Sequence, residues 1–246
     1  MTSDPALSPA MKAFFELHRD LPREGPGEAA DIQWAAEVAG TPQNAMIADV
    51  GCGPGGDIAA LLDVAPDGQV TALDTTAHFV QAAREAWQQD GRVTVLKADM
   101  ARIMNSHDLI WCAGAVYVLG VTKALTTWRK ALNKRGAIVF SEACWFTDDR
   151  SDRARALWDT EYPSMTNVAG ITAQIEAAGY DVLGQRQLSD AAWEAYYGPL
   201  ETRVAALRPG ADAALGTVLD EAEEEIACWR AHRDEFGYLL SVVRPR

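Results

Sequence analysis

The sequence predicts a doubly wound α/β domain with a mostly parallel, seven-stranded, Rossmann-like sheet. Three observations support this fold class. From residue 45 onward, apolar runs of strand length alternate with amphipathic helical segments, as in a parallel sheet covered on both faces. A glycine-rich stretch, "DVGCGPGG" at 49–56, joins the first strand to its helix. The final apolar run at 238–244 has no helix after it, so the last strand is expected to run antiparallel.

Length and composition are those of an ordinary globular domain, with 246 residues, 48% hydrophobic and 23% charged. The 22 basic and 35 acidic residues give a net charge of −13, so nucleic acid is not expected as a partner. The dispersed cysteines form no C-x-x-C pair, and we expect neither a metal site nor a disulfide scaffold. No signal peptide or membrane-length apolar run is found, which indicates a cytoplasmic protein without membrane contact. The sequence does not indicate an oligomeric state.

The first 40 residues are expected to form an N-terminal helical lid outside the sheet. Met11, Phe14, Phe15 and Leu17 suggest a short amphipathic helix. The two prolines and two glycines of "LPREGPG" at 21–27 end it in an irregular loop. Apolar residues on one face then predict a second helix over 28–39.

The segment 41–145 carries the regular alternation of a cofactor-binding core. Each predicted strand is short and apolar, and helical patterns follow three of them, near 57–65, 79–87 and 121–132. The predicted strands are 45–50, 69–74, 92–99, 108–114 and 136–143.

The segment 146–246 departs from this rhythm and is expected to supply substrate-side helices and the closing strands of the same single domain, 1–246. It predicts helices near 150–160 and 166–178, a strand at 180–188, a helical insertion over 190–207 and 211–234, and the last strand. The acidic run Asp220, Glu221 and Glu223 to Glu225 is predicted as a solvated helix face.

The glycine loop predicts a site for an adenosine-bearing ligand. Gly51, Gly53 and Gly56 form a G-x-G-x-x-G pattern between a strand and a helix, where the backbone can approach a ligand closely. Asp74 ends the next strand, where its carboxylate can accept hydrogen bonds from both hydroxyls of a ribose. NAD and S-adenosylmethionine both fit this much.

Three features favour S-adenosylmethionine. A carboxylate at Asp49 is unhelpful beside a pyrophosphate but suits the ammonium group of a methionine moiety. Asp99, after the third strand, can accept a hydrogen bond from the adenine amino group, and Met100 offers a polarizable surface to the ring. The third feature is the expected antiparallel last strand.

These motifs, over roughly 45–145, resemble the class I S-adenosylmethionine-dependent methyltransferases. "LPREGPG", "LIWCAGAVYVLG", "WRKALNKRGAIVFSEACWF" and "WEAYYGPL" further resemble a bacterial group of small-molecule methyltransferases, although that group often has Ser-Glu where this chain has Cys112-Ala113. The resemblance implies in-line methyl transfer to a small molecule, with S-adenosyl-L-homocysteine as product. It implies cofactor contacts from Asp49, Gly51, Cys52, Gly53, Gly55, Asp74, Thr75, Asp99, Met100 and Cys112.

Few residues are needed for the chemistry, because a sulfonium methyl group is already activated and alignment supplies most of the rate. A base is needed only where the acceptor must lose a proton, and Glu142, near the end of the fifth strand, is the candidate. A strand-end acid that binds backbone N–H groups is the alternative for this residue.

Several further residues are candidates around the ligands. Tyr117, Trp145 and Tyr196 are expected to form walls of the acceptor pocket. Arg23, in the lid loop, either pairs with a carboxylate of the cofactor or acceptor, or lies in solvent. His18 is expected to be structural, and Cys52 a small packing residue rather than a nucleophile.

Two other functions remain open from sequence. One is an NAD(P)-dependent oxidoreductase, for which no Tyr-x-x-x-Lys pattern is recognisable. The other is a protein that binds S-adenosylmethionine without catalysis. Titration with both cofactors and methyl-transfer assays distinguish the three.

Overall fold

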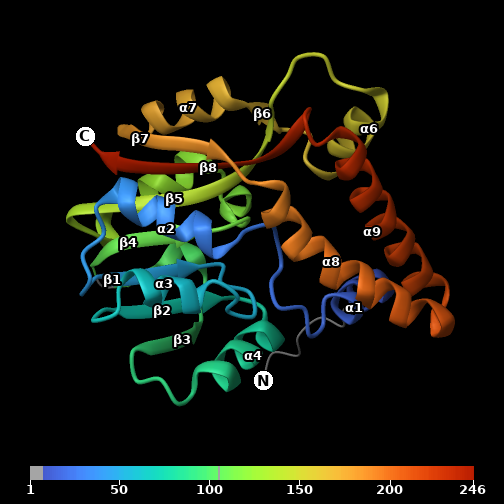
Figure 1. Ribbon diagram of the computed structural model, residues 1–246, viewed down its shortest axis with the longest axis horizontal. Helices are drawn as coiled ribbons and strands as arrows, with labels where there is room; N and C mark the ends of the chain where they lie inside the picture. The colour runs from blue at the N-terminus through green and yellow to red at the C-terminus, as the bar shows by residue number, and fades with distance from the viewer. Residues whose placement is uncertain (1–7, 105) are drawn as a thin grey trace.

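The computed structural model describes residues 8–104 and 106–246, and its centre is one twisted sheet (Figure 1). The strand order is β3-β2-β1-β4-β5-β8-β7, with the two-residue β6 paired to β5 off this path. The strands are β1 Met46–Val50, β2 Gln69–Asp74, β3 Val93–Lys97, β4 His107–Cys112, β5 Leu132–Trp145, β6 Thr166–Asn167, β7 Tyr180–Gln187 and β8 Phe236–Pro245.

Strand direction confirms the predicted sheet. Pairing is parallel from β3 through β5, whereas β8 is antiparallel to both β5 and β7. The antiparallel last strand is therefore confirmed, while β6 was not predicted, and β5 begins at Leu132 rather than at residue 136. The strand order reverses at β1, which lies between β2 and β4, and ligands of such sheets bind beyond the strand ends at this point.

Helices cover both faces of the sheet. The bounds are α1 Pro9–Leu17, α2 Ala29–Ala39, α3 Ile58–Val64, α4 Ala77–Trp87, α5 Val121–Trp128, α6 Asp152–Glu161, α7 Val168–Ala177, α8 Asp190–Leu207 and α9 Ala213–His232, with single 3-10 turns at 100–102, 116–118, 129–131 and 208–210.

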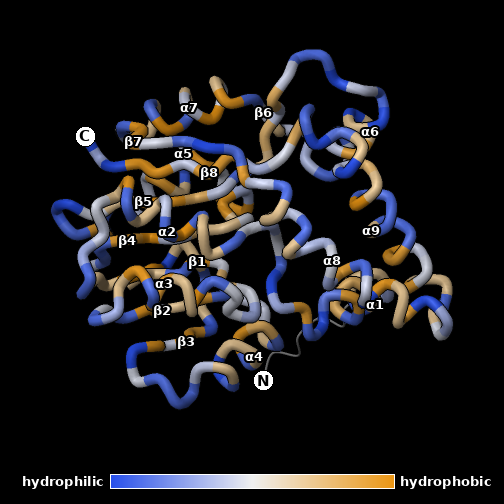
Figure 2. The backbone as a smooth tube through the Cα atoms, in the orientation of Figure 1, coloured by the Kyte–Doolittle hydropathy of each residue, from blue (hydrophilic) through white to orange (hydrophobic). Residues whose placement is uncertain are grey.

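Alternation along the strands divides the core into two layers. Ile47 and Leu109 pack on the side of α2 and α3, and Ala48 and Ile110 on the side of α5 and α7. Figure 2 shows hydrophobic residues concentrated in central strands such as β4. Both faces of the central strands are therefore closed to solvent, as expected of a parallel sheet, whereas β3 and β7 at the edges are partly exposed.

A second group of helices lies beyond the carboxyl ends of the parallel strands. In Figure 1, α1, α6, α8 and α9 gather on the right of the sheet. Trp193 of α8 stacks on Trp229 of α9 with ring centroids 5.0 Å apart, so aromatic packing joins these two helices. None of the helices in the described part of the chain is both long and apolar enough to cross a bilayer.

Candidate active site

A cleft of about 960 Å³ opens where β1, β2, β3 and β4 end. One wall is formed by the residues that follow these strands, and the facing wall by α1, the loop at 21–27, α8 and α9. The volume matches the upper range of ligand pockets. The wall on the sheet side is lined by Asp49, Gly51, Cys52, Gly53, Asp74, Thr75, Ala98, Asp99, Met100, Ala113, Gly114 and Ala115.

The glycine loop brings bare backbone to this cleft. Gly51 and Gly53 have φ of +73° and +53°, a left-handed conformation that side chains disfavour. The N–H groups of Gly51 and Cys52 both donate to the carbonyl of Leu73, at 2.9 and 3.1 Å, which fixes the loop to β2. A Cβ on Gly51 would lie 2.6 Å from the Cβ of Ala115, so this close approach requires glycine.

Asp74 is held rigidly at the end of β2. Its Oδ2 accepts from the N–H of Gly53 at 3.1 Å, and its Oδ1 accepts from the N–H of Thr76 at 2.7 Å. A carboxylate oxygen can accept more than one hydrogen bond, so both oxygens keep capacity for a ligand hydroxyl. The predicted ribose-binding acid thus lines the cleft in a fixed orientation.

Asp49 is buried at the point where the strand order reverses. It is 3% exposed, and its Oδ2 has no hydrogen-bond partner among the described residues. Burial, together with the nearby charges of Asp57 and Asp74, raises its pKa well above the ordinary value. Because an orphaned buried carboxylate is costly, a cationic group in the cleft would stabilise it. This free acceptor oxygen therefore fits the ammonium group of a methionine moiety, which would donate to it.

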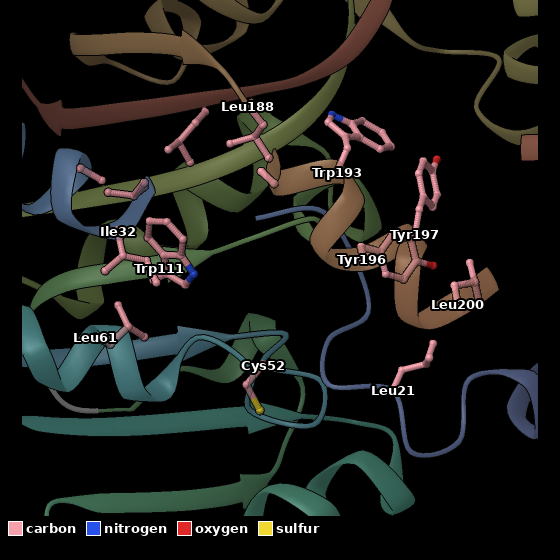
Figure 3. Packing of buried hydrophobic residues seen from close by; sticks show 14 of the residues in the cluster. Leu21, Ile32, Cys52, Leu61, Trp111, Leu188, Trp193, Tyr196, Tyr197 and Leu200 are labelled. Atoms are coloured by element: carbon pink, nitrogen blue, oxygen red, sulfur yellow. The ribbon is translucent and has the colours of Figure 1, made fainter. Parts of the chain in front are cut away.

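The remaining predicted cofactor residues differ in their placement. Asp99 is exposed, accepts from the N–H of Ala101 at 2.8 Å and lines the cleft beside Met100 and Thr75. Cys52 also lines the cleft and is mostly buried, and burial raises the pKa of its thiol, in keeping with a packing role. Figure 3 shows Cys52 in the glycine loop, with Leu21 on the N-terminal segment and Tyr196 on α8.

Two predicted cofactor residues lie outside the cleft lining. Cys112 is completely buried in the layer between the sheet and α5. Successive side chains of β4 point to opposite faces of the sheet, so Trp111 faces the other layer. Gly55 forms part of the turn at φ +92°, and Gly56 lines the cleft in its place. The structure thus places Cys112, predicted as a cofactor residue, in the packing behind the cleft.

Arg23 ties the loop at 21–27 to the core. Its Nε donates to the carbonyl of Gly25 at 2.5 Å, and its Nη2 donates to Oδ1 of Asp57 at 3.2 Å. The other oxygen of Asp57 accepts from Trp111 Nε1 at 2.8 Å. The alternative in which Arg23 lies in solvent is therefore wrong. Sequence reasoning missed Asp57, whose position after the glycines was the available signal.

His18 contributes to the same wall. Its Nδ1 lies 2.6 Å from Oε2 of Glu24, and its ring stacks on Phe14 with centroids 4.0 Å apart. Burial raises the pKa of Glu24. These contacts support the predicted structural role, although His18 also lines the cleft.

A smaller inner cavity of about 230 Å³ adjoins the cleft. Glu142 of β5 lines it, is only 4% exposed and accepts a hydrogen bond at Oε1 from the hydroxyl of Tyr162 at 2.6 Å. Burial raises the pKa of Glu142 to about 7. The alternative prediction was that Glu142 binds backbone N–H groups. Its hydrogen-bond partner in the described structure is instead the hydroxyl of Tyr162. The two cavities share Gly114, Tyr117, Leu157, Glu161 and Glu225 in their linings.

The predicted aromatic walls separate into two kinds. Tyr117, 54% exposed, lines both cavities, and Tyr196 lines the cleft. Trp145 lines neither. It is buried, with Phe236 edge-on at 6.0 Å and the guanidinium of Arg150 over its ring at 4.5 Å. Its place in the packing between β5 and β8 corrects the prediction that it walls the pocket.

The prediction that the acidic run on α9 forms a solvated face is correct only in part. Asp220 and Glu224 form surface ion pairs with Arg208 and Arg153, as a solvated face predicts. Glu225 instead turns inward and accepts from the hydroxyl of Tyr197 at 2.9 Å. Burial raises its pKa. One helix therefore carries charge both to solvent and to the site.

The strand order, the glycine loop after β1 and the acids that end β2 and follow β3 are the features that a class I methyltransferase is expected to have. Residues 47–136 match the family model described as a methyltransferase domain. This match and the relatives described next support an S-adenosylmethionine-dependent methyltransferase. The oxidoreductase alternative is set aside on this match.

Relatives extend the likeness over most of the chain. Trans-aconitate 2-methyltransferase of Rhodococcus jostii is 26% identical over 211 residues, 81% of this chain and 80% of that protein. Ribosomal RNA large subunit methyltransferase G of Pseudomonas putida is 32% identical over 112 residues, 44% of this chain but 30% of that protein. The crystal structure of a methyltransferase from Geobacter sulfurreducens with S-adenosyl-L-homocysteine has a TM-score of 0.79 at 18% identity, covers 96% of this chain and 98% of that one, and shows the shared fold.

Proposed function

We propose that the cleft binds S-adenosylmethionine and that the inner cavity holds a small-molecule methyl acceptor. The observation that carries the proposal is the junction of the two cavities, which share five lining residues between the acids of the cleft and Glu142. When bound, the cofactor supplies an activated methyl group on sulfur.

The cofactor contacts follow from the side chains of the cleft. Asp74, already oriented by Gly53 and Thr76, accepts from the ribose hydroxyls. Asp49 receives the ammonium group, because its Oδ2 is buried without a partner in the described structure. Asp99 accepts from the adenine amino group, and the thioether of Met100 contacts the ring.

Glu142 is the proposed proton acceptor for the methyl acceptor. Its pKa of about 7 divides the residue between its charged and neutral forms near neutral pH, which suits a general base. Tyr162 orients the carboxyl group through its hydroxyl. The in-line geometry is supplied by the cavity walls, and such positioning contributes about 7–11 kcal/mol in well-oriented reactions.

A small molecule is favoured over nucleic acid as the acceptor. The lining of the cleft includes Asp57, Glu161 and Glu221, which would repel a phosphate backbone. The match to the ribosomal RNA enzyme covers less than half of this chain. A cytoplasmic location belongs to the same proposal and is tested by cell fractionation.

Isothermal titration provides the first test. S-adenosyl-L-homocysteine is expected to bind with a stoichiometry of one, whereas NAD gives no saturable heat. Labelled methyl transfer to a metabolite panel, with ribosomal RNA as a parallel substrate, then separates an enzyme from a binding protein. Saturable binding of NAD alone, or methylation of RNA alone, would contradict the proposal.

A further inference from the structure

The charged residues in the lining of the inner cavity are all acidic. Glu142 from β5, Glu161 from α6 and Glu225 from α9 all contribute to it. No Lys, Arg or His side chain from residues 8–104 or 106–246 is among its lining residues. Three carboxyl groups from different elements therefore face one small space without a basic partner in its wall.

Glu142 has an acceptor oxygen to spare. Only its Oε1 is engaged, by the hydroxyl of Tyr162, and no hydrogen bond from the described residues reaches Oε2. The side chain is nonetheless almost completely buried. Glu225 is likewise held by a tyrosine hydroxyl, that of Tyr197, rather than by a cation. Burial raises the pKa of both carboxyl groups and outweighs the lowering effects of the tyrosine hydroxyls and, at Glu225, of the charge of His18, which lies outside this cavity.

Aromatic rings complete the wall. Tyr117, Trp158, Tyr162 and Tyr238 line the cavity, and the rings of Tyr117 and Tyr162 lie 6.1 Å apart. The face of an aromatic ring attracts a cation, and its carbon surface accepts an apolar body. The wall of the cavity therefore combines carboxyl groups with aromatic faces and includes no basic side chain from the described residues.

We propose that the methyl acceptor is an amine with an apolar body, which is cationic in solution and enters the cavity ammonium group first. This inference rests on the proposed function, because it takes the inner cavity as the acceptor site. It separates this chain from trans-aconitate 2-methyltransferase, since a tricarboxylate would set like charges against Glu142, Glu161 and Glu225.

Methyl transfer to an amine requires one proton transfer and one exchange of bonds at the methyl carbon. The ammonium group gives one proton to the carboxylate of Glu142, which leaves a neutral amine with a free electron pair. The nitrogen then forms a bond to the methyl carbon, while the carbon–sulfur bond breaks with its electron pair remaining on sulfur. The N-methylated product leaves as an ammonium ion, and Glu142 returns its proton to solvent.

Titration with matched probes tests the acceptor class. Two series are titrated into protein saturated with S-adenosyl-L-homocysteine: 2-phenylethylamine, 2-phenylethanol and phenylacetate, then hexylamine, hexanol and hexanoate, with trans-aconitate in parallel. In at least one series the amine should bind about tenfold more tightly than its alcohol, and no carboxylate should saturate the protein. The inference is overturned if no amine binds, or if an alcohol, an acid or trans-aconitate equals the amines.

Variants locate the effect. Glu142→Gln should weaken binding of the amine about tenfold and leave the alcohol and S-adenosyl-L-homocysteine unchanged, and Glu161→Gln, at a more exposed position, should act in the same direction. Glu223→Gln makes the same charge change outside both cavities and should alter nothing. Equal effects of all three variants would sink the inference. If S-adenosyl-L-homocysteine does not bind the original protein at all, the proposed function itself is overturned.

Discussion

Single carboxylates set the properties of the site, and their roles follow from their partners. Asp74 is fixed by two backbone N–H groups, Asp49 keeps a buried oxygen without a partner in the described structure, and Glu142 is held by one tyrosine. The first is oriented for neutral hydroxyls, the second is suited to a positive charge, and the third is suited to moving a proton. Three residues of similar chemistry are thereby given different tasks.

Asp74→Ala is expected to weaken binding of S-adenosyl-L-homocysteine and leave the fold intact. The change removes charge-assisted hydrogen bonds worth about 2–3 kcal/mol, or roughly 30- to 150-fold in affinity. Isothermal titration measures the effect. Asp63→Ala, an exposed position on α3 outside the cleft, serves as the matched control. An unchanged dissociation constant would show that Asp74 does not bind the ribose.

Gly53→Val is expected to abolish cofactor binding more completely than Asp74→Ala. Gly53 has φ of +53°, and a Cβ there would lie 3.3 Å from Cγ of Glu24, at the wall of the cleft. Gly216→Val places the same side chain on α9, where a Cβ meets nothing within 4 Å. If folded Gly53→Val protein, verified by circular dichroism, binds as well as the Gly216→Val control, this loop is not in the site.

Glu142 is expected to give methyl transfer a rising pH dependence with a midpoint near pH 7. The reason is that a proton acceptor must be ionised, and burial raises its pKa to about 7. Initial rates from pH 5.5 to 8.5, with saturating cofactor and with acceptor well below its KM, measure the profile of the free site. Glu142→Gln should have low activity without this transition, whereas Glu223→Gln should keep it. A transition that persists in Glu142→Gln belongs to another group.

The same pKa has a consequence for stability. Because the folded protein binds this proton more tightly than the unfolded chain, the contribution of Glu142 is fully present below the unfolded pKa of 4.5 and is lost as the pH rises to about 7. Glu142→Gln removes that loss. The free energy of unfolding of Glu142→Gln, relative to that of the original protein, should therefore increase by about 2 kcal/mol between pH 5 and pH 8. Urea denaturation of both proteins at the two pH values measures this difference.

At the scale of elements, regular alternation made the sheet predictable and irregular connections did not. Residues 45–145 repeat strand and helix, so their order and the position of Asp74 could be predicted. The antiparallel direction of β8 was predicted separately, from an apolar run with no helix after it. Trp145 was misplaced because sequence alone does not tell which side of a long central strand meets a cavity. Glu225 was missed because α9 carries acids on more than one face, and only its packing selects the buried one.

The loop at 21–27 is the element most suited to closure over the cofactor. Arg23 and Asp57 join it to the core, and the N–H of Gly27 donates to the carbonyl of Ala192 on α8 at 3.0 Å. Hydrogen exchange of residues 15–30 should slow when S-adenosyl-L-homocysteine is added, because a bound ligand stabilises the closed arrangement. Mass spectrometry with and without saturating ligand measures this.

Arg23→Ala is the companion variant for the lid. It should lower turnover several-fold, whereas Arg135→Ala, an exposed arginine outside the cleft, should not. Exchange that stays fast with ligand, together with full activity of Arg23→Ala, would exclude a lid role for this loop.

At the scale of the whole molecule, the net charge of −13 and the acidic cleft act in the same direction. S-adenosylmethionine carries a net positive charge, whereas S-adenosyl-L-homocysteine is neutral overall. The affinity for the former should fall several-fold between 20 and 500 mM NaCl, because salt screens the attraction, and the affinity for the latter should change less. Titration at both salt concentrations measures the difference, and equal salt dependence would argue against electrostatic attraction in the cleft.

Because β8 lies between β5 and β7, the strands cannot join the sheet in the order in which they are synthesised. β7 is made before β8, yet its partner in the sheet is β8, which lies between it and β5. On the ribosome, the five parallel strands can pair once Trp145 has emerged, whereas β7 must wait until residues 236–245 are available.

The walls of the two cavities are therefore completed at different times. The sheet-side wall of the cleft depends on β1 to β4, which emerge early, whereas its facing wall needs α8 and α9. The inner cavity waits longest, because Glu142 lies opposite Leu239 in the β5–β8 pair and Tyr238 of β8 lines this cavity. A nascent chain that has formed its parallel strands still lacks a finished acceptor pocket. Methyl transfer is therefore expected only after β8 has been synthesised and has paired with β5 and β7.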